Sequence, residues 1–365
     1  MKLTRKILLN PGPVTTTDSV KNALVVPDIC HREHEFSELI QKVRRNIKEV
    51  VHANDNYTSI LFASSGTGAV EATISSVVPF EKKLLVIKNG VYSQRIIEIA
   101  RKFNIQVVTL DVSPFERPSL EILNNMLNAD ADISAVAMVH HETSTGLLNP
   151  LVEVGEVVKK FSKTFIVDAI SSYAGININI ANAHVDYLIA TSNKCLQGIP
   201  GISFVIANIE HLTKHKDMSR GFYFDLYQQY QSLEKQHVLR FTPPVQVVYA
   251  LSQALDEYFR EGEFVRFERY SENYRTLMEG LSQLNFEFPV PKELQSQLLI
   301  LTTFPVDKAY ISFSVLHDQL YARGYTIYPA SLNSDHAIRL ACFGDINKND
   351  IQNFIKELTY LLETL

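Results

Sequence analysis

The run ATSNKCLQG, at residues 190–198, is the stretch on which the fold prediction rests. The apolar run YLIA, at residues 187–190, leads into it and leaves Lys194 among small polar residues. Earlier in the chain, the apolar run FIVDA at residues 165–169 carries Asp168 near its end. Short apolar runs of this length are typical of buried strands. The sequence therefore predicts a lysine and an acid at the ends of two strands.

This pair of residues has a specific chemical use. A lysine in a partly desolvated pocket loses part of its preference for the charged form and can attack an aldehyde as a free amine. An aspartate beside a pyridinium nitrogen makes a charge-assisted hydrogen bond that preserves the electron sink of the ring. The pair indicates pyridoxal 5'-phosphate, with Lys194 attached to it and Asp168 on its ring nitrogen. The two residues alone leave open a surface lysine and a helix N-cap aspartate.

A small-residue loop further upstream predicts a phosphate site. The apolar run TSILFA, at residues 58–63, leads into SSGTG at residues 64–68 and then into a helical segment. Backbone N–H groups and the helix dipole converge on an anion at such a junction. A dinucleotide loop would need a third glycine where Glu71 stands, and the Gly-Lys-Ser/Thr of a nucleoside triphosphate loop is absent. A purely structural turn remains open.

The order of elements predicts an α/β fold. Apolar runs at 84–87, 107–110, 134–139, 165–167, 187–190 and 203–206 are separated in part by helical segments such as 95–103 and 151–161. Continuous apolar strands of this kind form mostly parallel sheets with helices on both faces. Ligands bind beyond the carboxyl ends of such strands. We therefore expect Asp168, Lys194, the 64–68 loop and the run HHETSTG at 140–146 to converge on one crevice.

Length, charge and cysteine content narrow the class of protein. The 365 residues suffice for a large domain and a smaller one, and the α+β pattern after residue 250 predicts the smaller one. A net charge of -5 makes nucleic acid and membranes poor partner predictions. The first residues are interrupted by NPGP too early for a signal peptide. Three scattered cysteines predict no metal site, no disulfide framework and a cytoplasmic location.

Six short motifs resemble one protein family. They are NPGP at 10–13, SGTGAVE at 65–71, NGVY at 89–92, ETSTG at 142–146, VDA at 167–169 and SNK at 192–194. Together they resemble the class V branch of the fold-type I aminotransferases. The resemblance implies a seven-stranded, mostly parallel sheet between helices in a large domain, residues 15–250. It also implies a small domain made of residues 1–14 and 251–365, and a homodimer with shared active sites.

The resemblance also implies roles for individual residues. Lys194 would hold the cofactor and act as the acid and base of catalysis, and Asp168 would pair with the ring nitrogen. Arg339 and Thr16 would bind the substrate. The residues implied to contact pyridoxal 5'-phosphate are Ser65, Gly66, Thr67, Tyr92, Thr143, Asp168, Thr191, Ser192, Lys194 and, from the neighbouring subunit, Thr242. A guanidinium suits a carboxylate and a phosphonate equally, although a strand-end surface arginine is the alternative for Arg339.

Three longer runs point to a substrate. HHETSTGLLNP at 140–150, NKCLQGIPG at 193–201 and RFTPP at 240–244 resemble the group that moves an amino group between 2-aminoethylphosphonate and pyruvate. The chain departs from that group at Ala330, Ser331 and Cys342, which border the substrate end. The alternative is another class V aminotransferase, of the alanine- or serine-glyoxylate type or with a related aminophosphonate.

Two more distant alternatives remain. A cysteine desulfurase needs a nucleophilic thiolate on a mobile loop, whereas Cys195 adjoins the lysine and Cys342 lies in a strand-like run. A non-catalytic regulatory protein would need a partner-binding or DNA-reading module, and the sequence contains no visible candidate for one.

Overall fold

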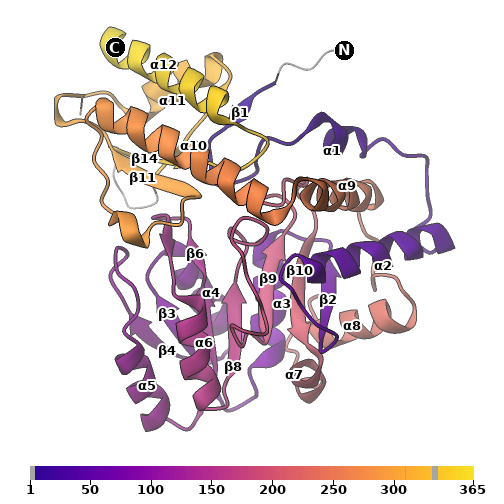
Figure 1. The fold of residues 1–365 in the computed structure, drawn as a ribbon. Helices are drawn as coiled ribbons and strands as arrows, with labels where there is room; N and C mark the ends of the chain where they lie inside the picture. Colours follow the sequence, from indigo (N-terminus) through magenta and orange to yellow (C-terminus); the bar gives the residue numbers. More distant parts are fainter. Residues whose placement is uncertain (1–4, 309, 331–335) are drawn as a thin grey trace.

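A seven-stranded sheet forms the centre of the larger lobe. The computed structural model describes residues 5–308, 310–330 and 336–365 (Figure 1). The strand order is β2-β10-β9-β8-β5-β3-β4, and β10 runs antiparallel to the other six strands. This confirms the prediction of a mostly parallel seven-stranded sheet. The strands are β2 (Tyr57–Phe62), β3 (Lys83–Lys88), β4 (Gln106–Asp111), β5 (Ile133–Val139), β8 (Thr164–Asp168), β9 (Tyr187–Thr191) and β10 (Ser203–Asn208).

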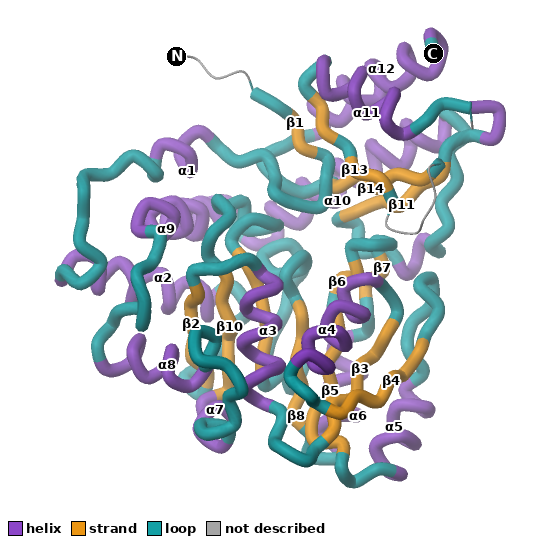
Figure 2. Tube along the Cα trace, turned by 180° about the vertical axis from the view of Figure 1, so that it is seen from behind, coloured by secondary structure: helices purple, strands orange, loops and turns teal. Residues whose placement is uncertain are grey.

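Helices cover both faces of this sheet. Helices α2 (His34–Glu49) and α6 (Leu151–Lys160) lie in front of it in Figure 1, and α3 (Gly66–Val77) and α4 (Val91–Lys102) lie in front in the reverse view of Figure 2. The inner strands can be apolar on both sides because helices keep water from both faces, whereas the edge strand β4 is partly exposed. The other helices of this lobe are α1 (Asp18–Asn22), α5 (Leu120–Ala129), α7 (Ile209–Lys214), α8 (Leu226–Lys235) and α9 (Val245–Glu261).

The C-terminal part forms a second lobe around its own small sheets. The three-stranded sheet has the order β11-β14-β13, and β1 pairs in parallel with β12. Two helices, α10 and α12, pack on each other above these strands, and β1 and α12 both lie in this lobe (Figure 1). Its elements are β1 (Ile7–Leu8), α10 (Glu263–Gln283), η1 (Lys292–Leu294), β11 (Leu299–Thr303), η2 (Val306–Lys308), α11 (Phe313–Ala322), β12 (Tyr325–Thr326), β13 (Tyr328–Pro329), β14 (Ala337–Ala341) and α12 (Lys348–Thr364).

The apolar side chains form two large clusters that follow these lobes. One runs from Val20 to Tyr258, and the other joins Ile7 and Leu9 to residues between 274 and 362. The division into residues 15–250 and 1–14 with 251–365 stays a prediction. We propose a boundary near Gly262, because the apolar side chains of α9 pack in the larger cluster as far as Tyr258.

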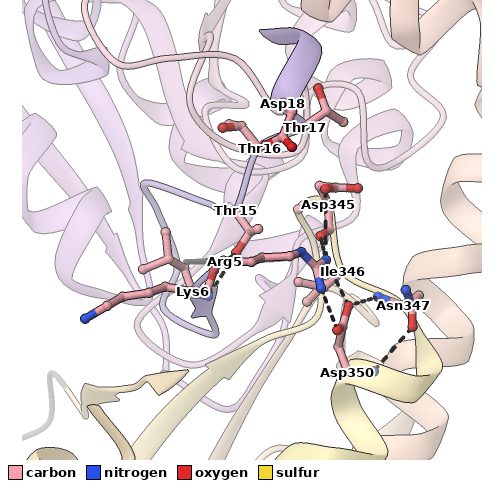
Figure 3. A network of polar contacts seen from close by, with 12 residues as sticks. Arg5, Lys6, Thr15, Thr16, Thr17, Asp18, Asp345, Ile346, Asn347 and Asp350 are labelled. Atoms are coloured by element: carbon pink, nitrogen blue, oxygen red, sulfur yellow. Dashed lines mark hydrogen bonds and ion pairs between the residues drawn. The ribbon is translucent and has the colours of Figure 1, made fainter. Parts of the chain in front are cut away.

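The N-terminal arm belongs to the second lobe and is fastened there by polar contacts. Arg5 donates to both carboxylate oxygens of Asp350, at 2.7 and 3.0 Å, and to the carbonyl of Asp345 at 2.5 Å (Figure 3). The hydroxyl of Thr15 accepts from the N–H of Leu8 and donates to the carbonyl of Lys6. The arm therefore leaves the second lobe at a fixed point before it crosses to the first.

Helix α8 was not expected from the sequence. The polar, aromatic stretch after Phe224 folds as α8, whose N-terminus is capped by Asp225 accepting from the N–H of Gln228 at 2.9 Å. The capping carboxylate replaces the missing intrahelical acceptor of the first turn. In the described ranges, no helix combines the length and the apolar character needed to cross a membrane.

Candidate active site

The carboxyl ends of β2, β8 and β9 meet at one cavity. Its volume is about 200 Å³. The parallel strands place their C-terminal loops at the same edge of the sheet, as the sequence predicted. The lining residues come from these loops and from α3 and α4: Ser65, Gly66, Thr67, Val70, Tyr92, Arg95, Ile96, Asp168, Ile170, Thr191, Asn193 and Lys194.

Lys194 lies at the cavity in the turn that follows β9. Its side chain is half-buried, and its ammonium donates to the carbonyl of Pro11 in the N-terminal arm. Burial lowers the pKa of this amine below the ordinary value of lysine, while Tyr92, Cys195 and Asp168 act in the opposite direction. Lys194 is thus not a solvated surface lysine, and its environment favours the neutral amine.

Asp168 is a buried carboxylate at the end of β8. Its Oδ1 accepts from the N–H of Ile170 at 2.9 Å, and no lysine or arginine in the described ranges forms an ion pair with it. Burial raises its pKa to about 6, with the charge of Glu142 adding to the increase. A buried carboxylate without a cation is costly unless a ligand supplies one. The carboxyl group lines the cavity, where a ligand could supply that cation.

The 64–68 loop turns into the first turn of α3. The N–H groups of the first helical turn have no intrahelical acceptor, and the hydroxyl of the N-cap Ser65 makes no capping bond. Gly66 packs so closely on Ile170 that a Cβ would lie 2.7 Å from Ile170 Cδ1. Arg95 places Nη1 3.4 Å from the Thr67 hydroxyl. Hydroxyls, free N–H groups and a guanidinium thus surround this end of the cavity, a set that suits an anion.

Helix α4 brings an aromatic ring and a cation to the same cavity. Tyr92 and Arg95 stand one turn apart, and the guanidinium carbon of Arg95 lies 4.9 Å from the centre of the Tyr92 ring. Both side chains line the cavity. Their i, i+3 spacing puts them on one face of the helix.

Arg339 approaches from the second lobe. It is 7% exposed in β14 and donates from Nε to the carbonyl of Pro329 at 3.0 Å and from Nη1 to the carbonyl of Thr143 at 3.1 Å. Arg339 is thus not a strand-end surface arginine. It ties the 142–146 turn of the larger lobe to β13 and β14 of the smaller one. The predicted departure at Ser331 lies outside the described residues; Ala330 follows β13, and Cys342 is buried.

Besides Arg339, four predicted site residues do not line the cavity. The hydroxyl of Ser192 donates to the carbonyls of Ile199 and Ile202, whereas its neighbour Thr191 does line the cavity. Thr143 is buried and meets Arg339 through its carbonyl. Thr16 is buried and its carbonyl accepts from Lys21 at 2.6 Å. Thr242 is exposed. The roles of these four residues, like those of the other predicted site residues, stay predictions.

The sequence reasoning missed three contributors. Arg95 follows the NGVY motif by one helical turn, so the i, i+3 spacing from Tyr92 was the available signal. Pro11 and Gly12 were noted as a motif, but their position over Lys194 follows only from the path of the arm. No local pattern gives that contact, because it joins residues that lie 183 positions apart in the chain.

The thiol of Cys195, the residue next to Lys194, is buried and not accessible to a substrate. Cys195 is 0% exposed and its thiol donates to the carbonyl of Ser171 at 3.2 Å. Burial raises its pKa to about 12. A thiolate nucleophile needs a lowered pKa and access, so this environment opposes a desulfurase role for Cys195.

The residues of the cavity fit pyridoxal 5'-phosphate. Lys194 offers an amine, Asp168 an uncompensated buried carboxylate, and Tyr92 an aromatic face. The end with Ser65 and Thr67 offers the donors that a phosphate needs. Each group that the cofactor carries therefore has a chemically matched residue in the cavity.

Comparison with known proteins gives one consistent family. Residues 17–312 match the family described as aminotransferase class-V. The chain is 38% identical over 348 residues, 94% of each chain, to a 2-aminoethylphosphonate–pyruvate transaminase of Salmonella paratyphi B. It is 38% identical over 352 residues, 96% of each chain, to one of Bacillus cereus.

A solved structure agrees with these matches. The alanine–glyoxylate aminotransferase of Nostoc sp. superposes with a TM-score of 0.91 at 25% identity, covering 99% of this chain and 96% of its own. Aminotransferases of this family depend in general on pyridoxal 5'-phosphate.

Proposed function

The chain belongs to the class V aminotransferase family, and from this membership we propose that it moves an amino group between 2-aminoethylphosphonate and pyruvate, using pyridoxal 5'-phosphate. The products are phosphonoacetaldehyde and L-alanine. The 38% identity along 94% of the chain to transaminases of that name carries the substrate proposal. The cavity with Lys194 and Asp168 supports the cofactor.

In this proposal the cavity residues divide the binding of the cofactor. Lys194 attaches it, Asp168 pairs with the ring nitrogen and Tyr92 stacks on the ring. Ser65, Gly66, Thr67 and Thr191 hold the phosphate, and we add Arg95 to this group because it lies within 3.4 Å of the Thr67 hydroxyl. Thr143 lies at the edge of the ring. When bound, the cofactor supplies the electron sink that lets the amine-bearing carbon of the substrate lose a proton.

The side chains of this protein move the proton and hold the charges. Burial lowers the pKa of the Lys194 amine, which favours the neutral form that lets Nζ take a proton from the amine-bearing carbon and return it later. With a pKa of about 6, Asp168 is ionised above neutral pH and can hold a protonated ring nitrogen. The Pro11–Gly12 segment covers the amine and limits the access of water to it.

Arg339 is the proposed residue for the anionic end of both substrates. It is nearly buried, and Nη2 has no acceptor among the described residues. A guanidinium binds the phosphonate of one substrate and the carboxylate of the other with the same planar set of donors. One residue can therefore serve both halves of the reaction. The second proposed substrate residue is Thr16.

We also propose a homodimer with shared sites and a cytoplasmic location. Thr242 is exposed in its own chain and lines no part of the cavity there. A residue of this kind can complete the phosphate site of a second subunit. The resemblance to the family supports this role, and a measurement of mass in solution tests the dimer.

A two-step experiment tests the reaction. The cofactor-loaded protein is incubated with 2-aminoethylphosphonate alone, desalted, and then given pyruvate. We expect about one equivalent of L-alanine per subunit, because the amino group stays on the protein between the steps. The same protein with Lys194→Ala should form none. Absence of alanine from the wild type would contradict the proposed substrate.

The second candidate is an aminotransferase of the alanine–glyoxylate type. The TM-score of 0.91 to a protein of that name favours it, and so do the departures at Ala330 and Cys342 near the substrate end. The matching experiment replaces the phosphonate by L-alanine and pyruvate by glyoxylate. Glycine formed here, with no alanine formed from the phosphonate, would identify this alternative.

A further inference from the structure

Glu142 is a buried carboxylate that the proposed reaction does not use. It ends the short strand β6 (His141–Glu142), which pairs with β7 (Leu147–Leu148), and it is 0% exposed. No described lysine, arginine or histidine forms an ion pair with it. A buried carboxylate of this kind costs free energy unless donors surround it.

Four donors from two different elements surround the Glu142 carboxylate. The backbone N–H groups of Tyr92 and Ser93, in the first turn of α4, each lie 3.3 Å from one of its oxygens. From its own turn, Ser144 donates its N–H at 3.3 Å and its hydroxyl at 2.8 Å, both to Oε1. The negative charge also lies at the positive end of the α4 dipole, which favours it.

The side chain reaches α4 through a slot left by a glycine. A Cβ on Gly90 would overlap Cγ and Cδ of Glu142. The backbone of Gly90 is extended, at φ -177°, so steric space and not backbone strain requires glycine here. The Ser144 hydroxyl makes a further contact with the start of α4, because it accepts from the N–H of Val91 at 3.4 Å.

These contacts connect the two proposed ends of the active site. Helix α4 carries Tyr92, the proposed ring-stacking residue, directly in the clamped turn. Next to Glu142 in the chain, Thr143 accepts the hydrogen bond of Arg339, the proposed substrate residue. A shift of Glu142 against α4 would therefore move the cofactor end and the substrate end relative to each other.

We propose that Glu142 is a positioning residue: its carboxyl group holds the start of α4 and the 142–146 turn in fixed positions relative to each other, and so fixes Tyr92 relative to Arg339. The proposal rests on the proposed function for the roles of Tyr92 and Arg339. Three of the four bonds are accepted by Oε1 and one by Oε2, so the carboxyl group acts as an acceptor for both elements. Burial raises the pKa of this group, and the bonds from Ser144, Tyr92 and Ser93 lower it.

The test compares Glu142→Gln with Glu98→Gln. Glutamine keeps the size and one acceptor oxygen but turns an NH₂ group toward a backbone N–H. Glu98 is the matched control, because it is an exposed carboxylate on the same helix, bonded to Gln94 at 3.2 Å. Two constants are measured for each protein: the Kd of the cofactor-free protein for pyridoxal 5'-phosphate and the KM for the amine substrate.

For Glu142→Gln we expect both constants to rise roughly tenfold with little change in the unfolding temperature, because lost hydrogen bonds to a charged group displace both ends of the site. Glu98→Gln should match the wild type. If Glu142→Gln also matches it, or if only its unfolding temperature falls, the positioning role is wrong.

A second variant covers the case in which Glu142→Gln does not fold. Ser144→Ala removes the 2.8 Å bond to Oε1 and leaves the carboxylate in place. Both constants should then rise by roughly twofold to fivefold, and unchanged constants would overturn the proposal. The cofactor titration also separates the two hypotheses. If the wild type converts neither the phosphonate nor alanine, the proposed function fails, while the titration still decides the role of Glu142.

Discussion

The side-chain amine of Lys194 donates a hydrogen bond to the main-chain carbonyl of Pro11. These two residues lie 183 positions apart in the chain. The contact places the N-terminal arm over the lysine at the cavity, and Arg5 fastens the same arm to the second lobe through Asp350 (Figure 3). The second lobe therefore contributes to the surroundings of the lysine although it supplies no part of the β9 turn.

Gly12 should tolerate no side chain. A Cβ there would lie 2.5 Å from Lys194 Cδ, and its φ of +121° is strained for other residues. Gly12→Ala should therefore lower kcat roughly a hundredfold by displacing the lysine. The matched control is Gly262→Ala, which has a φ of +85° but open space around it. Both variants should lose about 1 kcal/mol of stability; an equal loss of kcat in the control would contradict the explanation.

Asp168→Asn should stabilise the cofactor-free protein at alkaline pH while removing activity. The folded pKa of about 6 exceeds the ordinary 3.8, so between these values the folded state binds more protons than the unfolded state. Stability from this group is present below pH 4 and is lost as the pH rises through 6. At pH 8 the buried charge costs about 3 kcal/mol, at 1.36 kcal/mol for each pKa unit.

Thermal unfolding of cofactor-free Asp168→Asn at pH 8 and pH 4 measures the cost of the buried Asp168 charge. The variant should unfold at a higher temperature than the wild type at pH 8 and at nearly the same temperature at pH 4. Asp111→Asn is the control, because Asp111 is exposed and the hydrogen bond from Lys88 lowers its pKa. A destabilised Asp168→Asn at pH 8 would contradict the reasoning.

Arg339→Lys should weaken substrate binding and leave cofactor binding intact. The guanidinium donates to the carbonyls of Pro329 and Thr143 at the same time. A lysine cannot bond both carbonyls and still offer a planar pair of donors to an anion. The KM for 2-aminoethylphosphonate should rise roughly tenfold to a hundredfold, with an unchanged Kd for pyridoxal 5'-phosphate. Arg323→Lys, at an ion pair with Glu357 away from the cavity, is the control. An unchanged KM would remove Arg339 from the substrate site.

One of the three cysteines should react with a thiol reagent. Cys30 is exposed, whereas Cys195 and Cys342 are buried and burial raises the pKa of both. Titration of the folded protein with a chromogenic disulfide at pH 8 should give one rapid equivalent, and none in Cys30→Ser. Unfolding should expose the other two. Rapid reaction of Cys195 in the folded protein would reopen a role for its thiol.

Thr242→Ala should weaken cofactor binding only if two subunits share each site. The side chain is exposed in its own chain, so its loss removes no contact from the cavity there. The variant should form a dimer of the same mass in sedimentation while its Kd for pyridoxal 5'-phosphate rises severalfold, by roughly one hydrogen bond to a charged group. Thr213→Ala, on α7, should leave the Kd unchanged. A monomeric wild type would contradict the shared site.

Local sequence was sufficient to predict the sheet and much of the cavity. The apolar runs ending at Asp168 and before Lys194 specify buried strands, and parallel strands bring their carboxyl ends to one edge. The 64–68 loop could also be predicted from local sequence, because the strand, the small-residue loop and the helix that form it are adjacent in the chain. The resemblance to the family added Tyr92 and Arg339, and the structure places the first of these in the cavity.

Tertiary structure alone decided the contacts between distant segments. The covering of Lys194 by Pro11 and Gly12, the bond of Arg339 to the Thr143 carbonyl, and the grip of Glu142 on α4 each join elements far apart in sequence. Such contacts depend on the path of the chain between residues that are distant in sequence, and no periodicity of 2 or 3.6 residues encodes that path. Local sequence thus determined the strands, helices and loops that carry the chemistry, while packing between segments distant in the chain determined their mutual positions.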